Sequence, residues 1–269
     1  MAFLDRIGNQ GRLAGHRLPD DRRIQMDIET MPRGGFDASW LDRRLQTDRP
    51  EYLDRDDVDD RIKRQVIGSL DRMGRVLRDH DHFAERTLKL VADIPDPKIL
   101  ELGAGHGGLS RKLLEMHPTA HVTVTDLDPI SVSNIASGDL GSHPRAVVRQ
   151  MDATNIDAHD RSYDLALFVL SFHHLRPAPA AQVLAEGTRA ANKLLIVDLR
   201  RPPALLHLVR LAAFLPFALV LPFAHDGLIS SLRAYSPSGF RALAAHADPT
   251  IAVEISRLGR NQVVVAQRR

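Results

Sequence analysis

A short apolar run that leads into a glycine-rich turn constrains the fold of this chain more than any other feature. Residues 99–110 read ILELGAGHGGLS, and the following residues continue as RKLLEM. The apolar run is typical of a buried strand, and LSRKLLEM is typical of a helix. Glycines between a strand and a helix let the main chain approach a ligand closely, and Gly103, Gly105 and Gly108 have the spacing of nucleotide-binding turns. The stretch therefore predicts a strand-turn-helix unit, but its spacing alone does not choose the cofactor.

Strand-like and helix-like segments alternate after this turn. The expected strands cover residues 121–126, 145–152, 163–171 and 193–199, and the expected helices cover about 130–137 and 178–191. Such alternation implies parallel pairing in a sheet that is covered on both faces. Two further strand-like runs, 251–258 and 262–269, are separated only by Gly-Arg-Asn, which predicts a hairpin and an antiparallel last strand. The predicted fold class is α/β, a Rossmann-like doubly wound sheet that is mostly parallel and ends in this hairpin.

The remainder of the chain divides into three regions. Residues 1–50 mix charges with Gly and Pro without sustained apolar periodicity, which predicts a loosely structured arm. Residues 51–94 are expected to form N-terminal helices, because apolar residues recur at helical spacing from Val58 to Leu77 and a second helix follows from about His82 to Val91. Residues 95–269 are expected to form the cofactor-binding domain, with an apolar helical cap at about 202–247.

Acidic residues end three of the expected strands. Glu101 ends the first, Asp126 the second and Asp152 the third, and ligands bind at the carboxyl ends of the strands in sheets of this kind. Asp126 follows Gly108 by 18 residues, close to the interval at which an acid accepts both ribose hydroxyls of a dinucleotide. Asp128, before Pro129, is predicted only to cap a helix. Three acids at successive strand ends predict a shared binding site.

Together, these residues resemble the class I S-adenosylmethionine-dependent methyltransferases over roughly residues 90 to 269. The resemblance implies S-adenosyl-L-methionine as the cofactor. It places the glycine turn around the methionine portion, Asp126 at the ribose and Asp152 at the adenine amino group, and it gives Glu101 the cationic amino acid end. The cofactor-binding residues that it implies are Glu101, Gly103, Ala104, Gly105, Gly107, Asp126, Leu127, Asp152, Ala153 and Ser171.

Two other readings share these features. An NAD-dependent dehydrogenase has the same glycine spacing, but Glu101 would bring negative charge to a pyrophosphate, and the terminal hairpin does not suit a wholly parallel sheet. A scaffold that binds the cofactor without catalysis also stays open, although the three acids argue against it. Whether oxygen, carbon or nitrogen is methylated is not decided by the sequence.

The acceptor is predicted from the cap. Every residue from Leu211 to Ala224 is apolar or Pro, in a run shorter than a membrane span, and it is interpreted as a cap. This cap is expected to form a roof over the acceptor site or a surface that dips toward lipid, with a buried helix pair as the alternative. Residues 225–244 are similar to methyltransferases of phenolic lipids and polyketides, which implies a lipophilic, aromatic hydroxyl acceptor. The formal net charge of +2 gives no support for nucleic acid as a partner. The sequence leaves open whether the cap contacts a membrane surface or forms a homodimer face.

Histidines are the candidates for removing the acceptor proton, because their ordinary pKa lies near neutrality. His225 in the cap is preferred over His173 and His174, which follow the strand at 163–171. No metal site is predicted, since the chain has no Cys and His80, Asp81 and His82 lie at a helix boundary where neighbours point apart. The N-terminal residues lack the apolar core of a secretory peptide, which predicts a cytoplasmic location.

Overall fold

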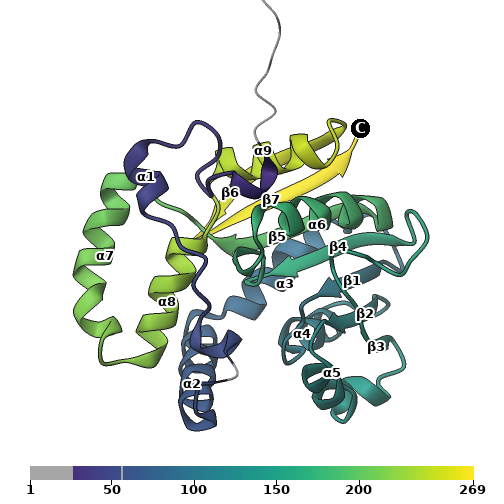
Figure 1. The fold of residues 1–269 in the computed structure, drawn as a ribbon. Coiled ribbons are helices and arrows are strands. Elements are labelled where there is room, and N and C mark those ends of the chain that lie inside the picture. The colour runs from purple at the N-terminus through teal and green to yellow at the C-terminus, as the bar shows by residue number, and fades with distance from the viewer. Residues whose placement is uncertain (1–26, 56) are drawn as a thin grey trace, which may run out of the picture.

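A seven-stranded sheet is the centre of the computed structural model, which describes residues 27–55 and 57–269 (Figure 1). The strand order is β3-β2-β1-β4-β5-β7-β6. Strands β1 to β5 pair in parallel, and β7 runs antiparallel between β5 and β6. The strands are β1 (Lys98–Leu102), β2 (His121–Asp126), β3 (Ala146–Gln150), β4 (Tyr163–Val169), β5 (Ala191–Leu199), β6 (Ile251–Leu258) and β7 (Asn261–Arg268). The predicted doubly wound sheet with a terminal antiparallel hairpin is confirmed.

Helices cover both faces of this sheet. In Figure 1, α6 and α9 lie on one face, and α3, α4 and α5 lie on the other. The α-helices are α1 (Trp40–Arg44), α2 (Asp60–Leu77), α3 (Asp79–Lys89), α4 (Gly108–Met116), α5 (Pro129–Ala136), α6 (Pro177–Ala190), α7 (Ala204–Ala218), α8 (Pro222–Arg233) and α9 (Pro237–Ala247). Short 3-10 turns are η1 (Ile28–Thr30), η2 (Tyr52–Asp54), η3 (Asp139–Ser142) and η4 (Phe172–His174).

Two hydrophobic cores lie on opposite faces because successive strand residues point in opposite directions. In β5, Leu194 and Ile196 belong to the core beneath α6 and α9, whereas Leu195 and Val197 belong to the core shared with α3, α4 and α5. All four side chains are fully buried. This is why the central strands are continuous apolar runs, and it makes the sheet a rigid support for its carboxyl ends.

The part of the N-terminal arm that the structure describes is ordered against the rest of the chain. Arg33 is only 3% exposed, and its guanidinium donates hydrogen bonds to the carbonyl oxygens of His173 (3.0 Å) and Arg233 (2.5 Å). It also lies over the ring of Tyr235. In residues 27–50, buried polar anchors thus take the place of the apolar periodicity that the sequence lacks. Residues 1–26 of that arm lie outside the described residues.

The apolar cap forms a helical hairpin, α7 and α8, but its first helix is not a roof. In Figure 1, α7 lies on the outer side of α8, away from the strand ends, and its main contacts are with α8 and α1. Many of its apolar side chains are exposed, including Leu205 (70%), Val209 (58%) and Phe217 (55%). The expected roof is wrong because an apolar run does not determine which neighbour it faces. Peripheral membrane contact and a homodimer face at this hairpin stay predictions.

Among the described residues, no helix is both long enough and apolar enough to cross a membrane.

Candidate functional site

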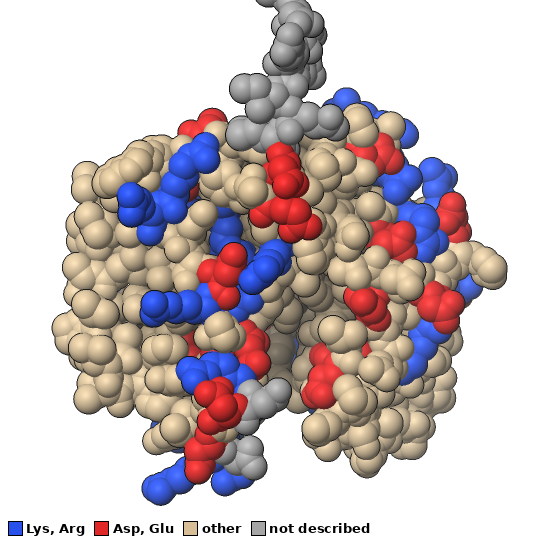
Figure 2. Space-filling model, in the orientation of Figure 1, with Lys and Arg blue, Asp and Glu red and all other residues tan. Residues whose placement is uncertain are grey.

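A cleft opens at the carboxyl ends of the parallel strands. Figure 2 shows this hollow between the part of the molecule that holds α2, α7 and α8 and the part that holds α4 and α5. Strands β3, β2, β1 and β4 are consecutive neighbours in the sheet, so the residues that follow them lie side by side. The predicted cofactor residues come from the ends of these four strands. The sheet therefore brings together residues that are up to about 70 positions apart in the sequence.

The turn after β1 requires glycine at specific positions. Gly103, Gly105 and Gly107 have positive φ angles of 63°, 59° and 75°, which side chains other than glycine rarely adopt. A Cβ at Gly107 would lie 2.6 Å from Leu140, whereas a Cβ at Gly105 would meet nothing within 4 Å. The loop is thus packed on one side and open at Gly105. That open backbone is the kind of surface that a ligand can approach closely.

Glu101 is buried at the end of β1, with 4% of its surface exposed. The Ser110 hydroxyl of α4 donates a hydrogen bond to its carboxylate. Burial raises the pKa of Glu101 to about 7, and the nearby negative charge of Asp126 acts in the same direction. Burying the negative charge of such a carboxylate is costly. A cationic ligand offsets that cost because its positive charge stabilises the carboxylate, so the site favours a cation.

The raised pKa predicts a specific pH dependence of stability. With a folded pKa of about 7 against 4.5 when unfolded, folding favours the protonated acid, so the unfolding free energy falls as pH rises through this window. We expect Glu101→Gln, which cannot ionise, to gain stability relative to the unmodified protein by roughly 2 to 3 kcal/mol between pH 5 and pH 8. Urea unfolding of both proteins without ligand at the two pH values measures this difference. If the difference in unfolding free energy between the two proteins is the same at pH 5 and pH 8, Glu101 is not held in a poorly solvated site.

Asp126 ties the ends of β1 and β2 together. Its Oδ2 accepts a hydrogen bond from the Gly105 backbone N–H at 2.8 Å, and its Oδ1 accepts one from Asp128 N–H at 3.0 Å. A carboxylate has about four lone-pair sites, so two remain for the hydroxyls of a ligand. Next to it, Leu127 is 62% exposed, and its carbonyl accepts a hydrogen bond from the Gln150 side chain at the end of β3.

The end of β3 is joined to the same edge. Met151 N–H donates to the Asp126 carbonyl at 3.0 Å, which places Asp152 beside the end of β2. The exposed Asp152 carboxylate accepts hydrogen bonds from the backbone and hydroxyl of Thr154 through one oxygen, Oδ1. The next residue, Ala153, is half-buried and packs against the core.

The remaining predicted cofactor residues frame the glycine turn. Ala104 is 9% exposed, and its N–H donates to the Thr125 carbonyl at 2.9 Å. Ser171 follows β4, and its Cβ would lie 3.7 Å from a Cβ placed at Gly103. All the predicted cofactor residues thus lie at the ends of four adjacent strands. Their carboxylates suit a ligand with a cationic end and neighbouring hydroxyls.

A histidine and carboxylate cluster lies at the end of β4. The His173 ring nitrogen Nδ1 is 2.7 Å from Asp198 at the end of β5, and His174 Nδ1 is 3.1 Å from Asp54 in η2. Burial opposes a charge on His173, but Asp198 and Glu51 outweigh it and raise the pKa of His173 to about 9. An imidazole that already carries a proton at neutral pH is poorly suited to accept another one.

His225 occupies a different environment, in the first turn of α8. Its ring stacks on Tyr52 at a centroid distance of 4.0 Å, and its Nδ1 is 3.0 Å from Asp226 Oδ1. Asp226 is 2% exposed and also accepts the Tyr52 backbone N–H at 2.9 Å. The side chain of His225 remains 28% exposed. A carboxylate on Nδ1 orients the ring and leaves Nε2 for another partner.

Sequence reasoning missed Glu51, Asp54 and Asp198. The signal for Asp198 was present, because it is an acid near the end of an expected strand, as are Glu101, Asp126 and Asp152. Glu51 and Asp54 lie in the N-terminal region, about 120 residues before the histidines that they contact. No local pattern connects segments so far apart.

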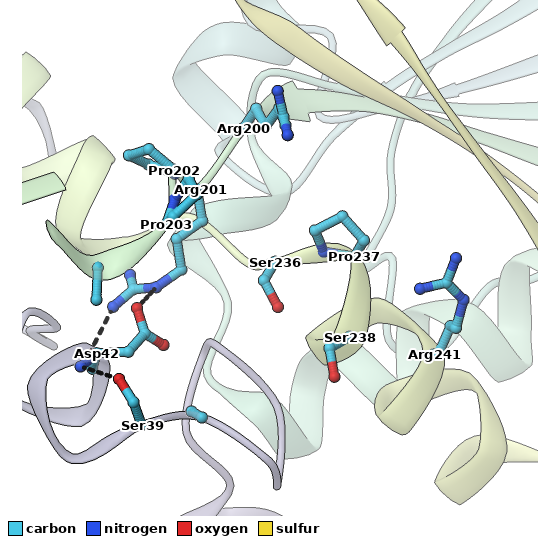
Figure 3. A pocket seen from close by; sticks show the side chains of 12 residues that line it. Ser39, Asp42, Arg200, Arg201, Pro202, Pro203, Ser236, Pro237, Ser238 and Arg241 are labelled. Carbon is cyan, nitrogen blue, oxygen red and sulfur yellow. Dashed lines mark hydrogen bonds and ion pairs between the residues drawn. The ribbon is translucent and has the colours of Figure 1, made fainter. Parts of the chain in front are cut away.

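A separate hollow of about 390 Å³ lies beside α1 and the amino end of α9 (Figure 3). Arg201 lines it and is held by Asp42 at 2.9 Å, and Arg241 and Ser238 lie on its opposite side (Figure 3). None of the predicted cofactor residues lines this hollow.

Part of the chain is similar to known methyltransferases. Residues 99–193 match the family described as a methyltransferase domain. A malonyl-[acyl-carrier protein] O-methyltransferase from Geobacter sulfurreducens is 31% identical over 122 residues. That match covers 40% of this chain and 45% of the relative, so it spans less than half of that protein.

Solved structures share the fold. The plantazolicin methyltransferase BpumL, in complex with a monoazolic desmethylPZN analog and SAH, aligns with a TM-score of 0.61 and 15% identity over 85% of this chain and 96% of that chain. The pyocyanin biosynthetic protein PhzM aligns with a TM-score of 0.51 and 19% identity over 70% of this chain and 54% of that chain. At these identities, the likeness is one of fold.

Proposed function

We propose that the chain is a class I S-adenosylmethionine-dependent methyltransferase that transfers a methyl group from S-adenosyl-L-methionine to a hydroxyl of a lipophilic, aromatic small molecule. The observation that carries this proposal is the convergence of Glu101, the open glycine turn and Asp126 at adjacent strand ends within the matched domain. The bound cofactor supplies a methyl group activated on a sulfonium sulfur.

The chain's own residues bind and orient the cofactor in this proposal. The carboxylate of Glu101 would hold the cationic amino acid end, and the open backbone at Gly105 would allow close approach. Asp126 would accept hydrogen bonds from the ribose hydroxyls with its remaining lone pairs, and Asp152 would hold the adenine. Ala104, Leu127, Ala153 and Ser171 line the same edge. The protein's main contribution to the rate is then alignment of the acceptor oxygen with the methyl carbon.

We assign removal of the acceptor proton to His225. Asp226 orients its ring, and its partial exposure leaves it accessible to a ligand. His173, the other candidate, holds its own proton in the ion-paired cluster with Asp198, which favours a positioning role. A hydroxyl acceptor suits a histidine base, since proton removal makes the oxygen a stronger nucleophile.

Two other functions are less well supported. A dehydrogenase would place the pyrophosphate of NAD beside the turn, where a negative charge on Glu101 would repel it. Methylation at carbon or nitrogen uses the same cofactor site and differs only in the acceptor. A scaffold without catalysis is opposed by the retention of the complete set of carboxylates at the strand ends.

Lipophilicity of the acceptor is testable directly. In Figure 1, α2 lies beside the cleft, and two of its apolar side chains, Leu70 and Met73, are 40% and 37% exposed. We therefore expect transfer to lipophilic aromatic hydroxy compounds and none to tRNA, rRNA or DNA, which require a cationic track. Release of S-adenosylhomocysteine with each acceptor class measures this. Methylation of nucleic acid without activity on lipophilic compounds would contradict the proposal.

A further inference from the structure

We propose that Glu51, His173 and His174 form a binding site for a divalent transition-metal ion, with Zn²⁺ as the best match. One ligand atom from each residue lies within 4.8 Å of the other two. Glu51 directly precedes η2, whereas both histidines lie in η4 at the end of β4. Two imidazoles and one carboxylate form a ligand set of known zinc sites, in which water takes the fourth position.

Both imidazoles are oriented as metal ligands are. His173 Nδ1 contacts Asp198 at 2.7 Å and His174 Nδ1 contacts Asp54 at 3.1 Å, so each Nε2 is left to face Glu51. Histidines that bind metals almost always place their other ring nitrogen against a carboxylate, a carbonyl or water, which fixes the ring and its tautomer. This arrangement occurs twice in the cluster, once for each ring.

The spacing of the ligand atoms leaves room for an ion. His173 Nε2 lies 3.5 Å from Glu51 Oε1, and His174 Nε2 lies 3.9 Å from Glu51 Oε2. Both separations exceed a normal N–H···O hydrogen bond. Ligands about 2.0 to 2.1 Å from a tetrahedral Zn²⁺ are about 3.3 Å from one another. The two separations involve different oxygens of Glu51, and the three ligand atoms all lie within 4.8 Å of one another. The ligand atoms would therefore have to approach one another by at most about 1.5 Å to seat the ion between Glu51 and the two rings.

The surroundings hold the ligands in place and supply negative charge. Glu51 and His173 are 5% and 4% exposed, and the Ser230 hydroxyl donates to Glu51 Oε1 at 2.7 Å. Two arginines contact the cluster away from Glu51: Arg233 is bound to Asp54 at 2.8 Å, and Arg33 donates to the His173 carbonyl at 3.0 Å. Of the three carboxylates of Glu51, Asp54 and Asp198, only Asp54 is paired with Arg233.

A bound ion would join the N-terminal segment to the end of β4. Glu51 stands at the start of η2, next to Tyr52, which stacks on His225. Metal binding would therefore stabilise this wall of the cleft and raise the thermal midpoint of the whole protein, because the ion binds only the folded arrangement. The site stands on the geometry of this cluster and does not depend on the proposed methyl transfer.

The test uses the full chain, freed of metal by a chelator and then equilibrated with Zn²⁺ or Co²⁺. We expect one equivalent of bound Zn²⁺ by elemental analysis, a four-coordinate Co²⁺ absorption spectrum and a higher thermal midpoint with either ion. His174→Ala and Glu51→Gln should each weaken binding at least about tenfold, and Asp54→Asn should weaken it by about 10- to 100-fold. His174 is the least buried ligand, so its variant is the one best placed to retain the fold.

His225→Asn is the matched control, because it changes a neighbouring histidine of similar exposure that is outside the cluster. This variant should bind Zn²⁺ as the unmodified protein does. The proposal is overturned if the protein retains only traces of Zn²⁺ after equilibration, or if folded His174→Ala binds Zn²⁺ with unchanged affinity. All of these readouts measure the metal itself, so they separate this proposal from a failure of methyl transfer.

Discussion

Asp126→Ala is expected to weaken the binding of S-adenosylhomocysteine by on the order of 2 to 4 kcal/mol, which is a loss of roughly 30- to 700-fold in affinity. The reason is that the variant removes two charge-assisted hydrogen bonds to the ribose hydroxyls. It also removes the acceptor for the Gly105 N–H, which helps to shape the turn. Isothermal titration calorimetry of the two proteins measures the difference.

Asp128→Ala is a matched control for that variant. Asp128 lies two residues away and caps α5 by accepting hydrogen bonds from Ile130 and Ser131. Its loss should cost about 1 kcal/mol of stability, as is usual for a helix cap, and should leave cofactor affinity nearly unchanged. Equal effects of the two variants on affinity, or unchanged affinity in a folded Asp126→Ala protein, would reject the site.

His225→Asn is expected to lower kcat by at least about tenfold while leaving cofactor affinity nearly unchanged, since general-base assistance contributes about 10² to 10⁴ in rate. Asparagine can keep a hydrogen bond to Asp226 but cannot accept the acceptor's proton. Raising the pH should partly restore the rate, because a phenol that ionises in solution needs no base. Steady-state kinetics across pH measure both effects.

The stacking of His225 on Tyr52 suggests the alternative to a catalytic role, which is a purely structural one. If the imidazole only stabilises this contact, the variant should lose stability or acceptor affinity, while the pH profile of kcat keeps its original shape. His246→Asn, in α9 and away from the strand ends, is the control for the loss of a histidine elsewhere. The assignment fails if both variants give the same pH profile.

Local pattern was sufficient to predict most of the fold and to place three acids at one edge of the sheet. The strands are apolar runs because they are buried on both faces. The turn after β1 can be recognised in the sequence by its glycines, which tolerate positive φ. Glu101, Asp126 and Asp152 could be identified because parallel strands end at one edge, so a position in sequence translates directly into a position in space.

Contacts between distant segments could not be predicted from local pattern. The run at 211–224 is apolar, as expected of a buried roof, yet α7 packs on α8 and exposes side chains such as Phe214 and Val220. Residues 27–50 lack apolar periodicity, yet one buried arginine, Arg33, anchors them to η4 and α8. Apolar periodicity indicates which face of a segment is buried. It does not indicate which other segment packs against that face.

The cluster around Glu51 is the clearest case of that limit. Its histidines are adjacent in sequence, but its carboxylates come from the N-terminal segment and from β5. The spacing of His80, Asp81 and His82 drew attention to a helix boundary, whereas the group able to hold an ion is assembled by the fold alone. Such a site becomes visible only when the three segments are placed together.

Calorimetric titration of the purified protein with S-adenosylhomocysteine and, separately, with NAD distinguishes the proposed cofactor site from a dinucleotide site. We expect saturable binding of one S-adenosylhomocysteine per chain, with affinity that declines as pH falls below about 7, where Glu101 becomes protonated. We expect no measurable binding of NAD under the same conditions. Binding of NAD without binding of S-adenosylhomocysteine would contradict the proposed cofactor site.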